Sequence, residues 1–156
     1  MAVIETEELR KEYRTLRGRA VRALAGLDLD VPEGGVFGFL GPNGAGKTTT
    51  IRCLLGLIQP SGGRVSLLGA TTRTELGRVI PNVGSIVETP ALFPGFSGRR
   101  NLQLLGRIDG IGPKAVDDVL ERVGLADRAR DLVHRYSLGM KQRLGIAAAL
   151  LRTRLC

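Results

Sequence analysis

The stretch that decides the fold is Gly41-Pro42-Asn43-Gly44-Ala45-Gly46-Lys47-Thr48, which has the pattern G-x-x-x-x-G-K-[ST]. Gly41 and Gly46 permit backbone angles that residues with a Cβ resist, so successive N–H groups can converge on a phosphate. In such a loop the Lys47 ammonium reaches the β- and γ-phosphate oxygens, and the Thr48 hydroxyl is a ligand for Mg²⁺. A helix that begins here adds the positive end of its dipole. The stretch therefore predicts a site for nucleotide phosphates.

The residues on either side supply the context that such a loop needs. Residues 35–40 form a short apolar run without alternation, which is typical of a strand buried on both faces. After the loop, apolar residues recur at helical spacing from Ile51 to Ile58, and Pro60 ends the pattern. The order strand, loop and helix favours a phosphate-binding loop over an ordinary glycine-rich turn.

Further strands are predicted on both sides of this centre. Apolar residues alternate with Asp28 and Asp30 over residues 27–31, which indicates a strand with one face in water. Residues 63–69 and 83–88 predict two more strands, the second of which ends in the carboxylate Glu88.

The sequence turns helical from Ser97 onward. Pro113 is suited to the first turn of a helix whose apolar residues lie on one face and which ends at Gly124. A last helix is predicted to begin near Ser137 and to run through Leu151.

Composition limits the class of protein. A chain of 156 residues with 43% hydrophobic and 24% charged residues is long enough for one globular domain with its own core. Two cysteines predict no disulfide framework, and Cys53 is expected to pack as a small apolar side chain. The first twelve residues include four glutamates and no apolar signal core, and no run reaches the ~18 apolar residues of a membrane span. We expect a cytoplasmic protein.

The net charge of +8 raises the question of nucleic-acid binding. The basic residues are spread along the chain rather than clustered, and only four Phe and two Tyr could stack on bases. Arginines on solvated faces explain the charge better, so no nucleic-acid partner is expected.

A second constellation follows about ninety residues after the loop, at Ser137-Leu138-Gly139-Met140-Lys141-Gln142. A Ser followed by Gly at the start of a helix can bind an anion, although a simple N-cap explains the Ser equally well. With the phosphate-binding loop before it, this segment resembles the signature motif Ser-x-Gly-x-x-Gln of the ATP-binding cassette (ABC) transporters, and the resemblance covers essentially the whole chain.

The resemblance implies a fold class. It is α/β: a P-loop NTPase core with an N-terminal antiparallel β-subdomain and an α-helical subdomain, and with the C-terminal part of the core missing. Residues 1–156 would then be a single ATP-binding domain, divided into the β-subdomain and core (1–95) and the helical subdomain (96–156).

The resemblance also assigns site residues. Tyr13 stands where the family has an aromatic that stacks on adenine, although packing within a strand is an alternative reading. Thr49 would line the phosphate site beside Lys47 and Thr48. Ser137, Gly139 and Gln142 would contact ATP held by the loop of a second subunit, in a head-to-tail homodimer or heterodimer. A separate transmembrane permease would place the chain at the inner face of the membrane.

Glu88 departs from the family pattern, which usually has a glutamine there that contacts Mg²⁺ or water. A carboxylate holds a metal more strongly. Glu88 resembles the branch that exports antibiotics and lantibiotics, which favours export of drugs, antibiotics or peptides. Residues 89–94 would face the permease, with Phe93 as a candidate contact, although core packing is an equal alternative for Phe93.

The family normally continues into an apolar strand that ends in Asp-Glu, with a switch His later, whereas this sequence ends at Arg152–Cys156. His134 precedes the signature and is expected to be a surface residue. Lys47 and Glu88 are then the remaining candidate catalytic residues, and we expect weak ATP binding and slow hydrolysis. The alternatives are an inactive remnant that at most binds nucleotide, or another P-loop enzyme such as a small-molecule kinase, against which the signature segment argues.

Overall fold

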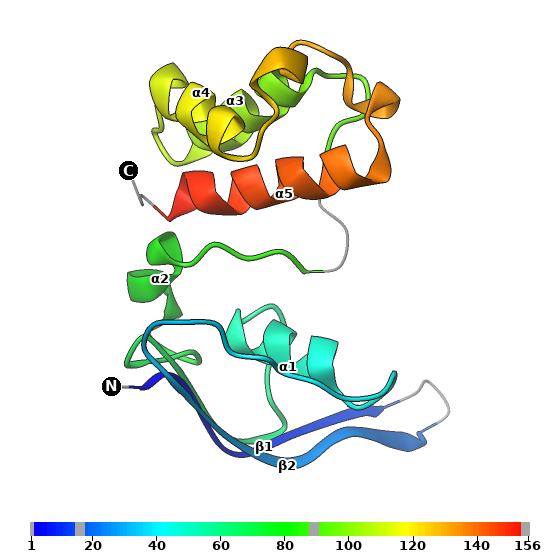
Figure 1. Cartoon of the computed structure of the whole chain (residues 1–156). Helices are drawn as coiled ribbons and strands as arrows, with labels where there is room; N and C mark the ends of the chain where they lie inside the picture. Colours follow the sequence, from blue (N-terminus) through cyan, green and yellow to red (C-terminus); the bar gives the residue numbers. More distant parts are fainter. Residues whose placement is uncertain (1, 15–17, 88–90, 154–156) are drawn as a thin grey trace. The chain divides into compact units, whose positions relative to one another are not determined.

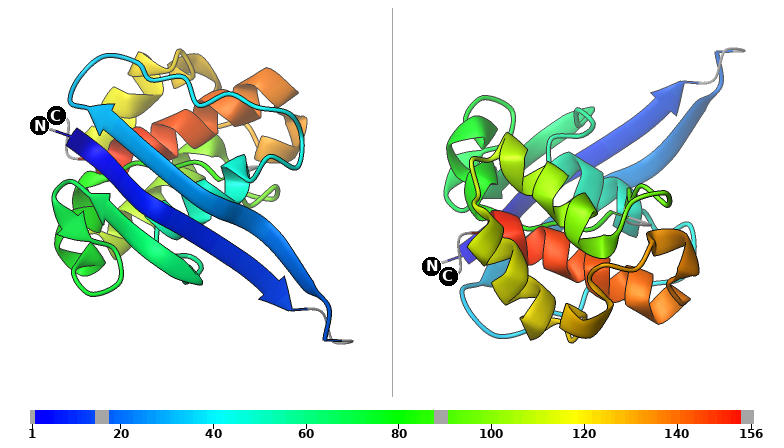
Figure 2. Two further views of the ribbon diagram at one scale, coloured as in Figure 1. Left: turned by 90° about the horizontal axis from the view of Figure 1, so that it is seen from below. Right: turned by 90° about the horizontal axis from the view of Figure 1, so that it is seen from above.

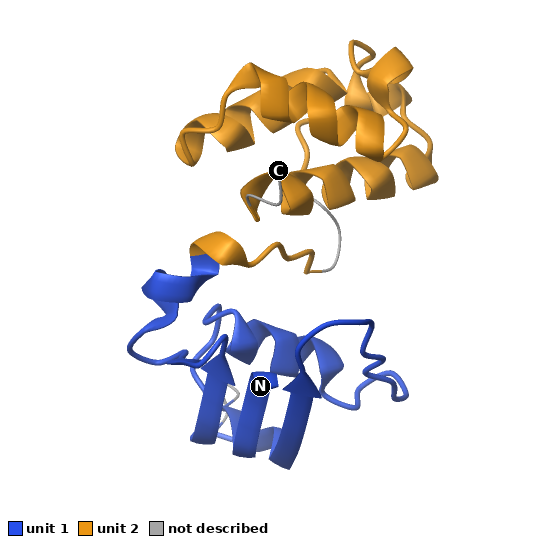
Figure 3. Ribbon diagram, turned by 60° about the vertical axis from the view of Figure 1, so that its left-hand side comes forward, with its two compact units in different colours: residues 1–80 blue, residues 81–156 orange. Residues whose placement is uncertain are grey.

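The computed structural model describes residues 2–14, 18–87 and 91–153. The chain divides into two compact units, Met1–Ile80 and Pro81–Cys156 (Figure 3). The phosphate-binding loop lies in the first unit and the signature segment in the second; the subdomain boundary expected after residue 95 stays a prediction. Within the described ranges, no helix is long and apolar enough to cross a membrane.

The first unit is built on a four-stranded antiparallel sheet with the order β2-β1-β3-β4. Strands β1 (Ala2–Arg14) and β2 (Ala20–Pro32) form a long hairpin (Figure 2). Strand β3 (Gly62–Leu67) pairs with the other side of β1, and the short β4 (Ala70–Thr71) pairs with β3. The alternation predicted over residues 27–31 is confirmed, because Val31 is buried and both aspartates are exposed.

Helix α1 (Lys47–Leu54) lies on one face of this sheet (Figure 1). The core between them consists of buried residues from β1, β2, α1 and β3: Leu9, Leu24, Cys53, Leu54 and Val65. Cys53 is completely buried as a free thiol, as expected, and burial raises its pKa. The helix is shorter than predicted. It ends before Ile58 because Gly56 takes a left-handed φ of 66° that turns the chain.

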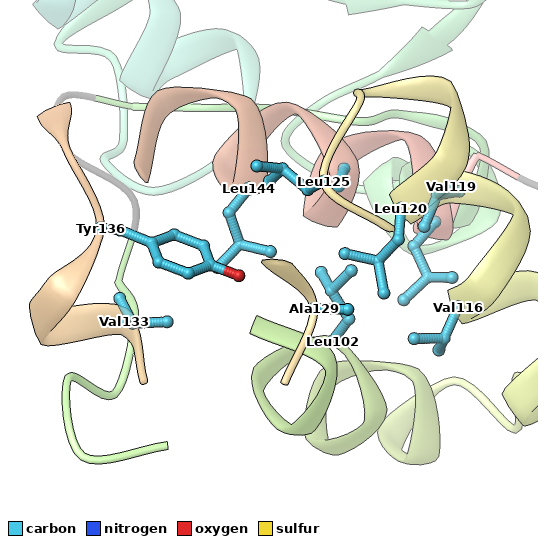
Figure 4. Packing of buried hydrophobic residues seen from close by; sticks show 11 residues of the cluster. Leu102, Val116, Val119, Leu120, Leu125, Ala129, Val133, Tyr136 and Leu144 are labelled. Atoms are coloured by element: carbon cyan, nitrogen blue, oxygen red, sulfur yellow. The ribbon is translucent and has the colours of Figure 1, made fainter. Parts of the chain in front are cut away.

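The second unit is helical. Its main helices are α3 (Gly98–Ile108), α4 (Pro113–Arg122) and α5 (Leu138–Arg152). They enclose a cluster of buried side chains (Figure 4): Leu102, Val116, Val119, Leu120, Leu125, Ala129, Val133, Tyr136, Leu144, Ala147 and Leu151.

The predicted helix signals of this unit are confirmed. Pro113 is the first residue of α4, and Gly124 follows the end of that helix with a φ of 65°. The hydroxyls of Ser97 and Ser137 cap α3 and α5 by accepting hydrogen bonds from the backbone N–H groups three residues later, at 3.2 Å in both cases. A four-residue helix, α2 (Leu76–Val79), precedes this unit.

Two predicted strands are wrong. Residues 35–40 are not a strand, and their Val36 and Leu40 side chains are almost fully exposed. An apolar run becomes a strand only where a neighbour supplies the ladder of hydrogen bonds, and none of β1–β4 pairs with it. Residues 83–87 are not a strand either. Gly84 lies instead against helix α5, where an added Cβ would be 2.5 Å from the Ala149 carbonyl oxygen.

A matched pair on α3 tests where the core of the second unit lies. Leu102 is completely buried, whereas Ile108 is 80% exposed. Leu102→Ala is expected to lower the free energy of unfolding by about 2–5 kcal/mol, because it removes apolar contacts and leaves a cavity. Ile108→Ala should change it by less than about 0.5 kcal/mol. Urea unfolding followed by circular dichroism measures both, and equal effects would contradict the packing described.

Candidate nucleotide-binding site

The loop before α1 has the backbone conformation of an anion-binding loop. Gly44 and Gly46 take positive φ angles of 84° and 90°, with Ala45 between them donating a backbone hydrogen bond to the Pro42 carbonyl at 3.2 Å. Residues with such alternating conformations direct successive N–H groups toward one side. Gly46 is also the N-cap of α1, so the loop leads directly into the first turn of the helix.

The first turn of α1 is open to an anion. Among the described residues, no side chain caps it, and its first turn carries no acidic residue. Thr48 is exposed, and its hydroxyl has no hydrogen-bond partner within the described part of the chain. Thr50, by contrast, is buried and donates its hydroxyl to the Gly46 carbonyl at 3.1 Å. The N-terminus of α1 therefore presents N–H groups and one free hydroxyl to a ligand.

Lys47 lies across the mouth of the loop. Its ammonium donates hydrogen bonds to the carbonyls of Gly41 at 2.5 Å and Pro42 at 2.8 Å. These bonds hold a positive charge beside the free N–H groups of the helix. Phosphate oxygens are stronger acceptors for an ammonium than these two neutral carbonyls.

A cavity of about 230 Å³ lies at this place in the first unit. Its wall consists of loop and α1 residues together with one residue of β2: Ala23, Asn43, Gly44, Gly46, Lys47, Thr48 and Thr49. Six of the predicted phosphate residues thus line this cavity, Thr49 among them, whereas Gly41, Pro42 and Ala45 do not.

The contribution of Ala23 was not predicted. In the hairpin Lys11 pairs with Leu24 and Glu12 pairs with Arg22, so Ala23 is the extra residue of a bulge. A Cβ on Gly46 would lie 2.8 Å from the Ala23 carbonyl oxygen and 2.5 Å from Leu24 Cδ2. Gly46 is therefore needed for close approach to β2 as well as for its φ. A bulge depends on pairing between strands, and no local pattern signals it.

The hairpin also carries Tyr13 on strand β1. Tyr13 pairs with Val21, which is two residues, or about 7 Å along the strand, from Ala23 at the cavity wall. The Tyr13 side chain is 39% exposed. The pair of strands that carries this accessible aromatic ring thus also contributes Ala23 to the wall of the cavity at the phosphate-binding loop.

The signature segment forms the N-terminus of α5 in the second unit. Ser137, Gly139 and Gln142 are all exposed, and Leu138 between them is 72% exposed. The first turn of α5 has no acidic residue, and an added Cβ at Gly139 would meet no atom within 4 Å. The Ser137 hydroxyl serves as the N-cap of this helix, which was one of the two predicted readings. Unlike α1, this helix is capped by a side chain, and its first turn lies among exposed residues without an acidic neighbour.

The described residues offer few candidate ligands for a divalent metal ion. Glu88, the predicted carboxylate ligand and candidate catalytic residue, lies outside them. Within the described ranges, no group of three or more His, Cys, Asp or Glu side chains could hold a metal ion. Among the described residues, the Thr48 hydroxyl fits a protein ligand of an Mg²⁺ that arrives with nucleotide phosphates. His134 is exposed, and its backbone N–H donates to the Pro94 carbonyl at 3.0 Å, in agreement with a surface position.

An aromatic loop stands before α3. Phe93 is 54% exposed and Phe96 is 42% exposed, with their ring centroids 5.6 Å apart. The buried amide of Asn101 fixes the loop, because it accepts from the Phe93 N–H at 2.7 Å and donates to the carbonyls of Phe93 at 3.1 Å and Ser97 at 2.9 Å. Phe93 is therefore a half-exposed side chain on a fixed backbone rather than core filling. Thr89 and Pro90 of the predicted partner-facing stretch lie outside the described residues.

Known proteins are similar to this chain over most of its length. The chain is 47% identical over 145 residues to the uncharacterized ABC transporter ATP-binding protein YhcH of Bacillus subtilis, covering 92% of this chain and 47% of that protein. It is 45% identical over 150 residues to the bacitracin transport ATP-binding protein BcrA of Bacillus licheniformis, covering 96% of this chain and 47% of that protein. The chain thus spans about half the length of these relatives.

A solved structure shows the same fold. The ATP-binding cassette MJ0796, in a dimeric post-hydrolysis state bound to ADP and Pi, superimposes with a TM-score of 0.83 at 23% identity, covering 96% of this chain and 69% of that chain. The sequence pattern of the family described as ABC transporter matches residues 24–155. With the phosphate-binding loop, the signature helix and these likenesses in agreement, the chain belongs to the ABC transporter family.

Proposed function

We propose that this chain is the ATP-binding part of an ABC transporter that couples nucleotide binding to export through a separate membrane subunit. The observation that carries the proposal is the presence in one chain of two helix N-termini that have no acidic residue in the first turn and that lie at the two motifs. One follows the phosphate-binding loop, Gly41–Thr48, and the other begins at Ser137. A nucleoside triphosphate has enough negative charge for two such sites.

The two helix N-termini would act in two different copies of the chain. In a head-to-tail dimer, as the family resemblance implies, the loop of one copy binds ATP and the Ser137–Gln142 segment of the other covers it. Exposed Ser137, Gly139 and Gln142 are available for this contact. Nucleotide would then promote dimer formation, because its γ-phosphate is shared between two chains.

Within one copy, each loop residue has a separate role. The Lys47 ammonium would bind β- and γ-phosphate oxygens, and the backbone N–H groups of residues 43–48 would hold the remaining charge. The Thr48 hydroxyl and Glu88 would hold Mg²⁺, which would supply positive charge to the phosphates. Tyr13 would stack on the adenine base. Lys47 and Glu88 would orient the reacting groups in hydrolysis.

The transported class and the permease contact follow from different features. A relative named for bacitracin transport, together with Glu88 in place of the usual glutamine, favours export of drugs, antibiotics or peptides. The exposed pair Phe93 and Phe96 favours this loop as a contact with the membrane subunit, which would hold the chain at the inner face of the membrane.

Nucleotide-dependent association tests the proposal directly. Light scattering on purified protein should show a larger mass with ATP and Mg²⁺ than with no nucleotide, and ADP with Mg²⁺ should not reproduce it. If calorimetry shows that the protein binds ATP but its mass does not change with ATP, a nucleotide site shared between two copies is contradicted.

Gly46 tests the phosphate loop itself. Gly46→Ala should weaken binding of inorganic triphosphate about tenfold or more, because a Cβ is strained at its φ and also meets Ala23 and Leu24. Gly44→Ala is the control, since it has a similar φ but no atom within 4 Å of an added Cβ. Calorimetric titration measures both variants. Equal losses in the two variants would contradict a role for the contact with β2.

Ser137 separates a transporter subunit from a P-loop kinase. Ser137→Ala and Ser97→Ala each remove a helix N-cap with a 3.2 Å hydrogen bond, so each should lower stability by about 1 kcal/mol. Only Ser137→Ala should abolish the ATP-dependent increase in mass. In a kinase, Ser137→Ala and Ser97→Ala should have the same effect on the mass measured by light scattering. Equal masses for the two variants in the presence of ATP would contradict the dimer.

A further inference from the structure

Lys11 contacts both the Tyr13 ring and the segment that follows α1 in the first unit. Its ammonium lies over the ring of Tyr13, 5.2 Å from the ring centroid. The same ammonium donates a hydrogen bond to the carbonyl of Gln59 at 2.6 Å. Gln59 follows α1 in the chain, and α1 begins at the phosphate-binding loop. One side chain therefore joins the aromatic ring to the segment beyond the helix that carries the loop.

The strand geometry explains why this lysine reaches both groups. Side chains two residues apart on a strand point to the same face, so Leu9, Lys11 and Tyr13 share a face of β1. Leu9 is completely buried in the core beside Cys53 and Leu54 of α1, which identifies this face as the one that α1 covers. Lys11 is accordingly half-buried, and its charge opposes the effect of burial on the pKa of Cys53.

We propose that Lys11 is a positioning residue for nucleotide binding: it covers one face of the Tyr13 ring and leaves the opposite face to stack on a purine base. The inference rests on the proposed function, because it concerns the base end of the ATP site. The bond to Gln59 fixes the ammonium, and the fixed ammonium limits the rotation of the ring. A ring that is ordered before the ligand arrives loses less conformational entropy on binding.

The expected effect is small and specific to the base. A cation over an aromatic ring at a partly exposed site is worth enough to change affinity about 2- to 5-fold. Lys11→Met keeps the length of the side chain and removes the charge, so it should weaken ATP binding by that factor. Inorganic triphosphate has no base, so its affinity should not change. Lys11→Arg should restore ATP binding, since a guanidinium also binds aromatic faces.

Intrinsic fluorescence gives a spectroscopic measure of the same contact. The chain has no tryptophan and two tyrosines, so its emission comes from Tyr13 and Tyr136. Subtracting the emission of Tyr13→Phe isolates the signal of Tyr13. ATP should quench this signal, whereas triphosphate should not. In Lys11→Met the quenching at saturating ATP should be smaller, because the ring is less well oriented.

The controls separate this inference from the function on which it rests. Lys114→Met removes an exposed lysine on α4 and should leave every reading unchanged. If Tyr13→Leu weakens ATP but not triphosphate while Lys11→Met changes neither, the role of Lys11 is wrong and the adenine site stands. If Lys11→Met weakens both ligands equally, Lys11 only stabilises the fold. If Tyr13→Leu leaves the preference for ATP unchanged, both the adenine site and the role of Lys11 are wrong.

Discussion

The backbone of Gly46 lies against the backbone of Ala23, and the candidate site of the first unit depends on this approach. Any side chain at position 46 would separate the phosphate-binding loop from strand β2. Because β2 pairs with β1, the contact also sets the distance between the loop and Tyr13. One residue without a Cβ thus determines how closely the phosphate-binding loop can approach the pair of strands that carries Tyr13. The glycine of the motif has a tertiary function in addition to its backbone freedom.

The sequence predicted best those features that depend on residues close together in the chain. The start of the helical region at Ser97, the N-cap at Ser137, the first turn at Pro113 and the stop at Gly124 are local, and the structure has all of them. Burial of Cys53 followed from the tendency of a free cysteine to pack as a small apolar side chain. These features depend only on residues nearby in the sequence and on the local pattern of apolar and polar side chains.

What the sequence could not predict depends on partners far away in the chain. Residues 35–40 have the composition of a buried strand, but no strand pairs with them among the described residues. The bulge at Ala23 exists only because two strands pair with unequal numbers of residues. The pair Lys11 and Tyr13 follows from strand alternation, but Gln59, which fixes the ammonium, lies 48 residues from Lys11. The resemblance to a family predicted which residues bind nucleotide. The shape of the site depends on these long-range contacts.

Buried Cys53 has a consequence for measuring how the first unit opens. Its side chain has no exposed surface, and its raised pKa keeps it protonated at neutral pH, so alkylating reagents cannot react with it in the closed state. Reaction requires α1 to move away from the sheet. The alkylation rate of this thiol therefore reports the local opening equilibrium of the helix that bears the phosphate-binding loop. The natural thiol of Cys53 can therefore measure how often this helix opens, without an introduced cysteine.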